Sequence, residues 1–217
     1  MMTSVPLSFF NIELGPCMTR NTIVFIDDDP DWKTQASRAS GRLDCECLFF
    51  ERATDVIDSI DAINPKLIVL DLAMVNLDGV YCHNAGIEIS ATLRKTFGDR
   101  FPILVLTGTE NPELICECLQ NGADDYFVKG DRITGLVKRI AAWLVVDYAA
   151  ANPRQEREAT ASALEILVAK HGNGAVRDWR KIVMAAISRR DAAPLGSLST
   201  SRALGDLFAW QSGLSHT

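Results

Sequence analysis

The sequence has no stretch of apolar residues that could cross a membrane, because no run approaches the roughly 18 consecutive apolar residues that a spanning helix requires. Residues 7–10 are too short for the apolar core of a secretory signal, and no basic residue precedes them. Proline next to Cys17, together with Glu13, argues against a lipoprotein cleavage site. These absences predict a cytoplasmic protein without a membrane partner.

Disulfide and zinc-binding patterns are absent as well. Six cysteines in 217 residues do not form the framework of a small secreted domain, and reduced thiols fit the cytoplasm. Cys45 and Cys47 fall in a predicted strand, and Cys116 and Cys118 fall in a predicted helix, where residues two apart point in different directions. No second pair is obviously near either of them. We therefore expect these cysteines to pack in the core rather than to bind a metal.

Strong positive charge is also missing, since the net charge is −6 and the pI is about 5.1. Residues 148–217 carry nine Lys and Arg against six Asp and Glu, a net of +3, which leaves −9 on residues 1–147. That tail is far from the pI above about 9 that is typical of nucleic-acid-binding domains. Arg177, Arg180 and Lys181 nevertheless share helical spacing beside Trp179, so a DNA-binding tail stays open as an alternative.

The length predicts one domain of roughly 130 residues with a small appendage. We assign residues 1–20 to a loose N-terminal arm, 21–150 to the main domain and 151–217 to a helical output or interaction region. Met18 directly precedes the first predicted strand, so either Met1 or Met18 is the start residue. Asn152-Pro153 should end one helix and begin the next. Further tail helices are predicted around Leu164, Trp179 and Leu204.

Short apolar runs and helical patterns alternate strictly along the main domain. The runs predict strands at residues 22–26, 43–50, 67–70, 102–106 and 126–128, and helices at 30–40, 54–63, 85–97, 112–121 and 131–150. Continuous apolar runs are typical of strands that are buried on both faces of a parallel sheet. The fold class is therefore α/β, a doubly wound, flavodoxin-like sheet of five parallel strands, with a small all-α C-terminal region.

Four of these strands are followed at once by a polar group. LIVL at residues 67–70 is followed by Asp71, the first strand by Asp27 and Asp28, the fourth by Thr107, and the last by Lys129. Because parallel strands deliver their carboxyl ends to one edge of the sheet, we expect these side chains to meet there. A nucleophilic carboxylate, acids for a divalent cation, a hydroxyl and an ammonium are suited to phosphoryl transfer.

The order of these groups, with DLAMVNLDG around the central acid and GADDYFVKG around the lysine, resembles the receiver domain of two-component response regulators. The resemblance covers roughly residues 21–148. It implies a signalling protein rather than an enzyme, at most capable of phosphorylating and dephosphorylating itself. The partner that it implies is a sensor histidine kinase or a phosphotransfer protein, whose phosphohistidine donates to Asp71.

The same resemblance implies a role for each site residue. Asp28, Asp71 and the backbone carbonyl of Ala73 would hold Mg²⁺, and Asp27 would assist through water. Lys129 and Thr107 would contact phosphoryl oxygens. Tyr126 matches the aromatic switch position of the family; the competing interpretation is a half-buried aromatic on an edge strand.

The sequence departs from the family at three places. Residues 80–86 look like an insertion of about seven residues that places Tyr81, Cys82 and His83 near the active edge; for His83 we expect a loop residue facing water rather than a ligand. Val75 replaces a proline of the family. Gly130 replaces the proline after the lysine, which predicts a trans peptide bond with Gly130 at positive φ.

The sequence also allows two other functions, a phosphatase and a DNA-binding protein. The run before Asp27 also fits the nucleophile motif of haloacid-dehalogenase-type phosphatases, but that family needs an acidic pair after its lysine, and Asp124 and Asp125 precede Lys129. The tail is either a protein-interaction or dimerisation region, which we prefer, or a DNA-binding one. Helix 131–150 has more apolar residues than one sheet-facing stripe requires, which predicts that tail helices cover it, within one chain or across a homodimer.

Overall fold

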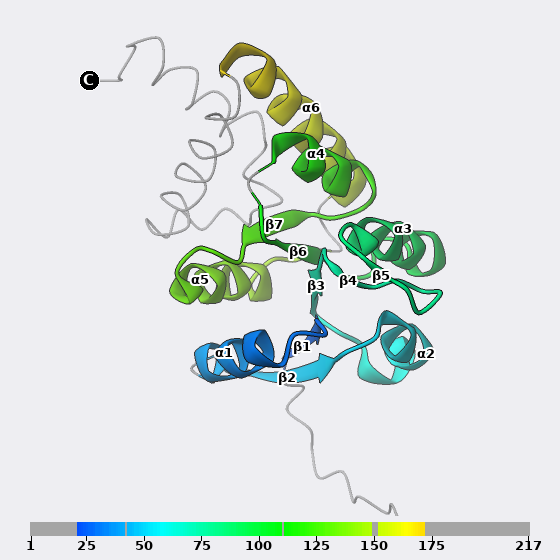
Figure 1. Ribbon diagram of the computed structural model, residues 1–217. Helices are drawn as coiled ribbons and strands as arrows, with labels where there is room; N and C mark the ends of the chain where they lie inside the picture. The colour runs from blue at the N-terminus through cyan, green and yellow to red at the C-terminus, as the bar shows by residue number, and fades with distance from the viewer. Residues whose placement is uncertain (1–20, 42, 110, 149–151, 172–217) are drawn as a thin grey trace, which may run out of the picture.

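The computed structural model describes residues 21–41, 43–109, 111–148 and 152–171 (Figure 1). The N-terminal arm and the predicted tail helices around Trp179 and Leu204 lie outside these residues. The elements, in chain order, are β1 Asn21–Ile26, α1 Pro30–Ser40, β2 Cys45–Phe50, α2 Ala53–Ile63, β3 Leu67–Asp71, β4 Met74–Val75, β5 Tyr81–Cys82, α3 Ala85–Phe97, β6 Ile103–Thr107, α4 Pro112–Gln120, β7 Asp125–Val128, α5 Ile133–Leu144 and α6 Pro153–His171.

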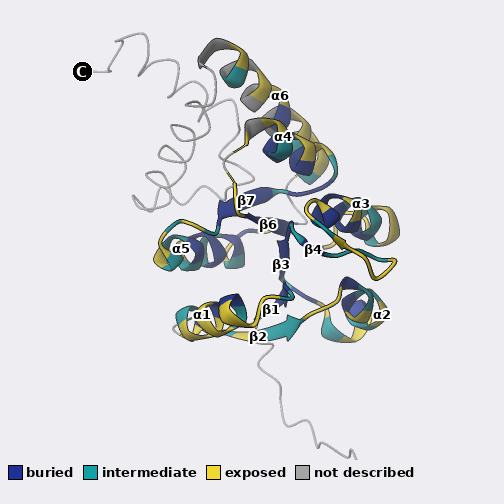
Figure 2. Cartoon of the chain, viewed as in Figure 1, coloured by how far each residue is buried: buried dark blue, intermediate teal, exposed yellow. Residues whose placement is uncertain are grey.

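The main sheet has five parallel strands in the order β2-β1-β3-β6-β7, which confirms the predicted fold class. The apolar side chains of its strands feed two cores. One lies under α2, α3 and α4 and the other under α1 and α5, and Figure 1 shows α1 and α5 on the side opposite α2 and α3. Strands β1, β3, β6 and β7 are almost wholly buried, whereas the edge strand β2 is half-exposed (Figure 2).

Local signals set the helix boundaries as the sequence predicts. The side chain of Asp29 accepts hydrogen bonds from the backbone N–H groups of Asp31 and Trp32, and Pro30 opens α1. Asn111 caps α4 in the same way before Pro112. These caps begin α1 and α4 directly after the strand ends that carry polar groups.

Helix α5 is shorter than the predicted 131–150, because it ends at Leu144. The chain then turns back onto the domain, where Val146 and Tyr148 are buried. Lys66, directly before β3, donates a hydrogen bond from Nζ to the carbonyl oxygen of Val146 at 3.0 Å. The predicted helix therefore ends early because its last apolar residues pack on the domain as a non-helical segment.

Helix α6 begins at Pro153 as predicted but packs along α4, and not on α5 as expected (Figure 1). For α6 within one chain the expected pairing is wrong, because the second core and α1 cover the apolar side of α5. The other predicted partner of α5, the helix around Trp179, lies outside the described residues. Gln120 of α4 donates to Glu165 of α6 at 2.7 Å, and Ala161 is buried in the contact. Among the described residues, no helix has the length and apolar character that crossing a membrane demands.

Candidate active site

The strand register brings the predicted side chains to one edge. Ile26 pairs with Leu70, so Asp27 and Asp71 follow in adjacent strands. Asp71 pairs with Leu106, and in the next pair of strands Thr107 pairs with Val128. The carboxyl ends of β1, β3, β6 and β7 therefore carry an acid, an acid, a hydroxyl and, one residue beyond β7, an ammonium.

Lys129 joins the two buried acids of this edge. Its Nζ lies 2.9 Å from Oδ2 of Asp27 and 2.9 Å from Oδ2 of Asp71, and both carboxylates are almost wholly buried. The backbone N–H of Lys129 donates to the carbonyl oxygen of Thr107 at 2.7 Å, which positions the start of its side chain. The Lys129-Gly130 peptide bond is trans, as predicted, but Gly130 does not adopt positive φ, so that part of the expectation is wrong.

The site holds more negative charge than one lysine neutralises. Burial, and then repulsion by Asp27, raise the pKa of Asp71 to about 6, although Lys129 and the backbone N–H of Ala73 oppose the shift. Burial also raises the pKa of Asp27 against the effect of Lys129. Burial alone would lower the pKa of Lys129, but the two carboxylates outweigh it and raise that pKa. Further positive charge would therefore be stabilised here.

A divalent cation fits this arrangement. Asp27, Asp28 and Asp71 each offer one carboxylate oxygen, and these oxygens all lie within 4.8 Å of one another. An all-oxygen set of this kind suits Mg²⁺, and the raised pKa values of two of the acids show that they need more neutralisation. The Ala73 carbonyl stays a predicted ligand, because the contact seen at Ala73 is its N–H on Asp71.

Thr107 lies at the edge, but its hydroxyl is engaged within its own loop. Its Oγ1 donates to the carbonyl oxygen of Thr109 at 3.2 Å and accepts from the Thr109 N–H at 3.1 Å. Short hydroxyl side chains form such local turns readily. The predicted contact with a phosphoryl oxygen therefore requires this hydroxyl to leave the loop.

Tyr126 is buried on β7, an edge strand of the main sheet. The competing expectation of a half-buried ring does not describe it, because only 3% of the residue is exposed. The guanidinium carbon of Arg139 in α5 lies 5.8 Å from the ring centroid, which connects Tyr126 with the next helix. Its role as a switch stays a prediction.

Two residues of the site escaped sequence reasoning. Trp32, in the first turn of α1, is buried, and its ring centroid lies 5.4 Å from Nζ of Lys129. Gly86 packs against the active loop so tightly that a Cβ atom there would lie 2.6 Å from the backbone oxygen of Asp71. The sequence offered one signal for Trp32, an aromatic residue just after the capped start of α1. No local pattern indicated that Gly86 packs against the backbone of Asp71.

The predicted insertion, residues 80–86, contains the second strand of a β-hairpin, in which β5 pairs antiparallel with β4, and β4 begins three residues after Asp71. His83 is exposed, and its ring meets that of Tyr81 edge-on. It is not among the residues grouped for metal binding, which within the described chain are the three aspartates alone. The loop role expected for His83 agrees with this exposure.

The cysteine pairs differ from each other. The Sγ atoms of Cys45 and Cys47 lie 3.8 Å apart on β2, where both residues are half-buried and pack against the core under α1 and α5, in agreement with the expected core packing. Cys116 and Cys118 are both buried although they point in different directions, because α4 lies between the sheet and α6. Cys118 belongs to the core under α4, and Cys116 faces Glu165 of α6.

A second charged cluster lies at the opposite edge of the sheet and joins α6 to the domain. Asp124, which follows α4, pairs with Arg94 of α3 and, at 2.8 Å, with Arg157 of α6. The hydroxyl of Tyr148 donates to the same carboxylate at 2.8 Å, and Arg157 also contacts Asp99 at 2.7 Å. Burial, and then the Asp124 carboxylate, raise the pKa of Tyr148, so its hydroxyl remains a donor.

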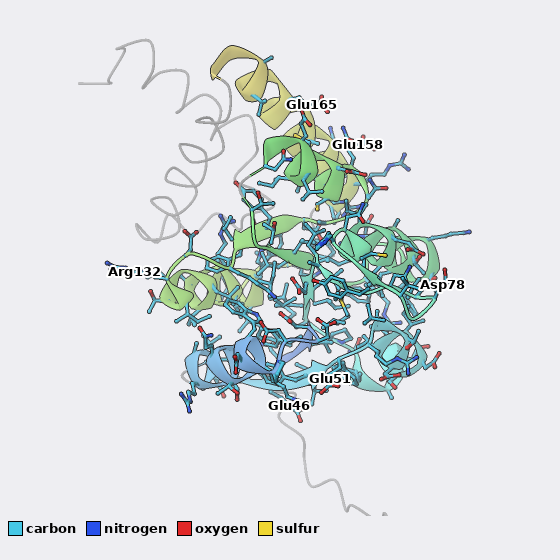
Figure 3. All side chains as sticks on the ribbon, in the orientation of Figure 1. Glu46, Glu51, Asp78, Arg132, Glu158 and Glu165 are labelled. Atoms are coloured by element: carbon cyan, nitrogen blue, oxygen red, sulfur yellow. The ribbon has the colours of Figure 1, made fainter. Side chains whose placement is uncertain are left out.

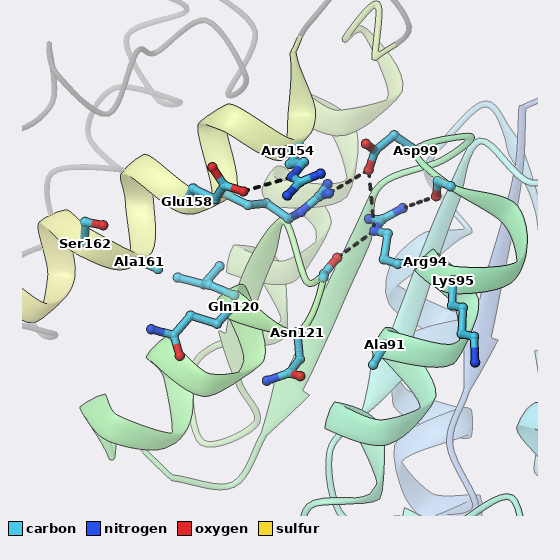
Figure 4. A pocket seen from close by; sticks show the side chains of 14 residues that line it. Ala91, Arg94, Lys95, Asp99, Gln120, Asn121, Arg154, Glu158, Ala161 and Ser162 are labelled. Atoms are coloured by element: carbon cyan, nitrogen blue, oxygen red, sulfur yellow. Dashed lines mark hydrogen bonds and ion pairs between the residues drawn. The ribbon is translucent and has the colours of Figure 1, made fainter.

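Figure 4 shows the groove of about 630 Å³ beside this cluster, between α3, α4 and α6. Two ion pairs are formed by residues that line it, the exposed Arg154–Glu158 pair and the Arg94–Asp99 pair. Both arginines of the buried cluster, Arg94 and Arg157, are already occupied by carboxylates. The groove therefore follows the boundary along which α6 packs on the domain.

Comparisons with known proteins agree with this geometry. The family model described as the response regulator receiver domain matches residues 23–141. The response regulator MprA of Mycobacterium sp. (strain KMS) is 34% identical over 125 residues, and that of Mycobacterium leprae (strain TN) 33% identical; in both cases the match covers 56% of this chain and 50% of the relative. The chain thus spans about half the length of these curated relatives.

Solved structures show the same fold. The BeF3-activated N-terminal receiver domain of Klebsiella pneumoniae RstA is 26% identical, with a TM-score of 0.50, and the match covers 58% of this chain and 100% of that one. A response regulator from Thermotoga maritima is 15% identical with a TM-score of 0.50, covering 58% of this chain and 99% of that one.

Proposed function

The chain belongs to the response regulator receiver domain family, and from that premise we propose that Asp71 is the residue that accepts the phosphoryl group. The observation that supports this is the position of Asp71, whose carboxylate lies at the carboxyl edge of the sheet within 2.9 Å of Lys129 and close to Asp27 and Asp28. The donor is the phosphohistidine of a sensor histidine kinase or phosphotransfer protein.

Asp71 acts as the nucleophile. A carboxylate oxygen of Asp71 attacks the phosphorus, an O–P bond forms, and the N–P bond to the donor imidazole breaks, with its electron pair returning to the imidazole nitrogen. The pKa of Asp71 at about 6 leaves the carboxylate mostly ionised at neutral pH. Lys129 holds this carboxylate at its Oδ2 atom, and its ammonium balances charge on the phosphoryl oxygens as the two groups approach.

Asp28, Asp71 and the Ala73 carbonyl would hold Mg²⁺, and Asp27 would assist through water. When bound, the ion would neutralise the repulsion between the carboxylates and the phosphoryl group. Thr107 would release its hydroxyl from the Thr109 loop to contact a phosphoryl oxygen. The loop between Thr107 and α4 would move as a result. Tyr126, on the neighbouring strand, would respond in the same region.

We propose that α6 receives this signal as part of the C-terminal output region, residues 151–217. The loop that contains Thr107 and Thr109 leads directly into α4, and α6 packs on α4. A shift of α4 therefore changes the contact that holds α6. This coupling supports an output through protein contacts or dimerisation, and DNA binding by the same region remains the alternative.

The phosphatase alternative does not agree with the site. It needs an acidic pair near the metal after the lysine, but Asp124 is paired with Arg94 and Arg157 at the opposite edge of the sheet. Asp125 is paired with Arg139, and Trp143 donates to it at 3.1 Å. The alternative also gives no role to Asp71.

The test is phosphorylation by acetyl phosphate with Mg²⁺, followed by intact-mass measurement. Wild type should gain one phosphoryl group, Asp71→Asn should gain none, and a chelator should prevent labelling of wild type. Asp78→Asn, an exposed acid on the nearby hairpin, is the matched control and should label normally. Unchanged labelling of Asp71→Asn would overturn the assignment of the site.

A further inference from the structure

The β4–β5 hairpin exposes apolar side chains beside the active edge. Among the described residues, the large apolar side chains that are exposed are Val80 at 57%, Tyr81 at 55% and Val145 at 79%. Val80 and Tyr81 are neighbours on the hairpin, and His83 places its ring 5.6 Å from that of Tyr81, nearly perpendicular to it. Tyrosine is among the residues that are enriched in protein–protein interfaces and that contribute most of their binding energy.

The hairpin loop is held by a dense set of local bonds. Asn76 and Val80 close it, with the N–H of Asn76 donating to the Val80 carbonyl at 2.8 Å. The side-chain oxygen of Asn76 also accepts from the N–H groups of Asp78 and Val80, at 3.1 and 2.9 Å. Gly79 takes the left-handed position, with φ of +83°, that a three-residue hairpin loop requires. A surface ordered in this way loses little entropy when a partner binds.

The base of the hairpin is built onto the backbone of Asp71. Met74 is fully buried, and Leu77 and Cys82 pack against the same core. The N–H of Gly86 donates to the carbonyl oxygen of Leu72 at 3.0 Å, at the place where a Cβ would collide with Asp71. These contacts therefore fix the position of the hairpin relative to Asp71.

The hairpin also lies within reach of any protein that docks over Asp71. The four residue-to-residue steps from Asp71 to Val75 span at most about 14 Å, and Tyr81 pairs directly with Val75. A protein interface of ordinary size covers about 800 Å² of each partner, which corresponds to a radius of roughly 16 Å. An interface centred on Asp71 therefore includes the base of the hairpin.

We propose that this hairpin, residues 74–82, is a docking surface for the protein that carries the phosphohistidine donor. The inference rests on the proposed function of Asp71. Because only 4% of Asp71 is exposed, the donor imidazole must be brought closely against this edge by the surface that carries it. The donor protein has a pocket that accepts the side chains of Val80 and Tyr81.

Charge supports this choice of partner. Exposed acids outnumber exposed bases in the segments that follow the carboxyl ends of β1, β2, β3 and β7: the acids are Asp29, Asp31, Glu51 and Asp78, and the bases are Arg52 and Arg132. Figure 3 shows Asp78 at the margin of the molecule. A second copy of this chain would set acid against acid at the edge, whereas a donor with a basic rim would complement it. A small phosphodonor would need no apolar contact at all.

The experiment compares two donors on the full chain. The variant Val80→Ser/Tyr81→Ser removes the apolar surface, and Val145→Ser is the matched control. Val145 is also apolar and is more exposed than Val80 or Tyr81, but it lies next to Val146, which contacts Lys66 at the opposite edge of the sheet. The protein donor is the autophosphorylated histidine kinase that transfers fastest to wild type in a screen of the kinases from the same genome. The small donor is acetyl phosphate with Mg²⁺.

We expect the double variant to lose at least about tenfold in kcat/KM with the kinase, while acetyl phosphate labels it at the wild-type rate. Val145→Ser should match wild type with both donors. Equal kcat/KM for the double variant and wild type would overturn the docking role alone, as would labelling by acetyl phosphate with no transfer from any kinase. Equal slowing with both donors would also overturn it, because the hairpin would then act through Asp71. Failure of wild type to label with acetyl phosphate would instead overturn the proposed function.

Discussion

The ammonium of Lys129 lies 5.4 Å from the centre of the Trp32 ring while it contacts the carboxylates of Asp27 and Asp71. A cation over an indole ring is attracted to it by about 0.5 to 2 kcal/mol. The chain after Lys129 is not stiffened by a proline, since Gly130 follows it. Trp32 therefore supplies a lateral contact that keeps the ammonium directed at Asp71.

We expect Trp32→Leu to slow the labelling of Asp71 by acetyl phosphate roughly threefold to tenfold, since the ring contact is lost. Trp32→Phe, which keeps an aromatic face, should recover most of the rate. Urea unfolding of both variants serves as a control for the buried volume that is removed. Equal rates for the leucine and phenylalanine variants would show that the ring only fills space.

The contact between Gly86 and Asp71 predicts a severe effect of one methyl group. Gly86→Ala should destabilise the fold by about 1 to 3 kcal/mol and slow labelling, because backbone atoms of Asp71 and Leu72 would have to move. Gly130→Ala is the control, since a Cβ there meets nothing within 4 Å and φ is not positive. Urea unfolding and labelling rates test both, and a wild-type stability of Gly86→Ala would contradict the close packing.

The buried cluster at Asp124 predicts that α6 is part of the folded domain. Arg157→Ala removes one of its two arginines and should cost about 3 kcal/mol of unfolding free energy. Arg154→Ala, which breaks an exposed pair on the same helix, should cost less than about 0.5 kcal/mol. If the two variants unfold at the same urea concentration, α6 is an independent module.

Cys116 reports on the same contact through its reactivity. Burial, and then Glu165 of α6, raise the pKa of its thiol from 9.0 to about 11, so at pH 8, below both values, little thiolate is present. Release of α6 by Arg157→Ala should lower that pKa and accelerate alkylation by up to about a hundredfold. Cys118, in the core under α4, should remain unreactive in both proteins. Site-resolved mass spectrometry measures both rates, and an unchanged rate at Cys116 would show that α6 stays docked.

Local patterns predicted the sheet and much of the candidate site. A continuous apolar run ending in Asp71 indicates a buried parallel strand, and its polar end must face the carboxyl edge, since a charge is costly within the sheet. The same argument placed Asp27, Thr107 and Lys129. The side-chain caps at Asp29 and Asn111 are equally local, so the starts of α1 and α4 followed from the sequence.

The tertiary structure alone decided which distant groups meet. Arg157 contacts Asp124, which is 33 residues away in the sequence, and Trp32 contacts Lys129, which is almost a hundred residues away. No periodicity encodes such pairs, because the free energy of burying a charge or a ring depends on partners that only the folded chain assembles. For the same reason α6 packs on α4 and α5 ends early at Leu144, although the apolar pattern of the sequence favoured a longer α5 paired with the tail. The sequence by itself determined where strands end and which chemistry they present, and packing determined what holds that chemistry in place.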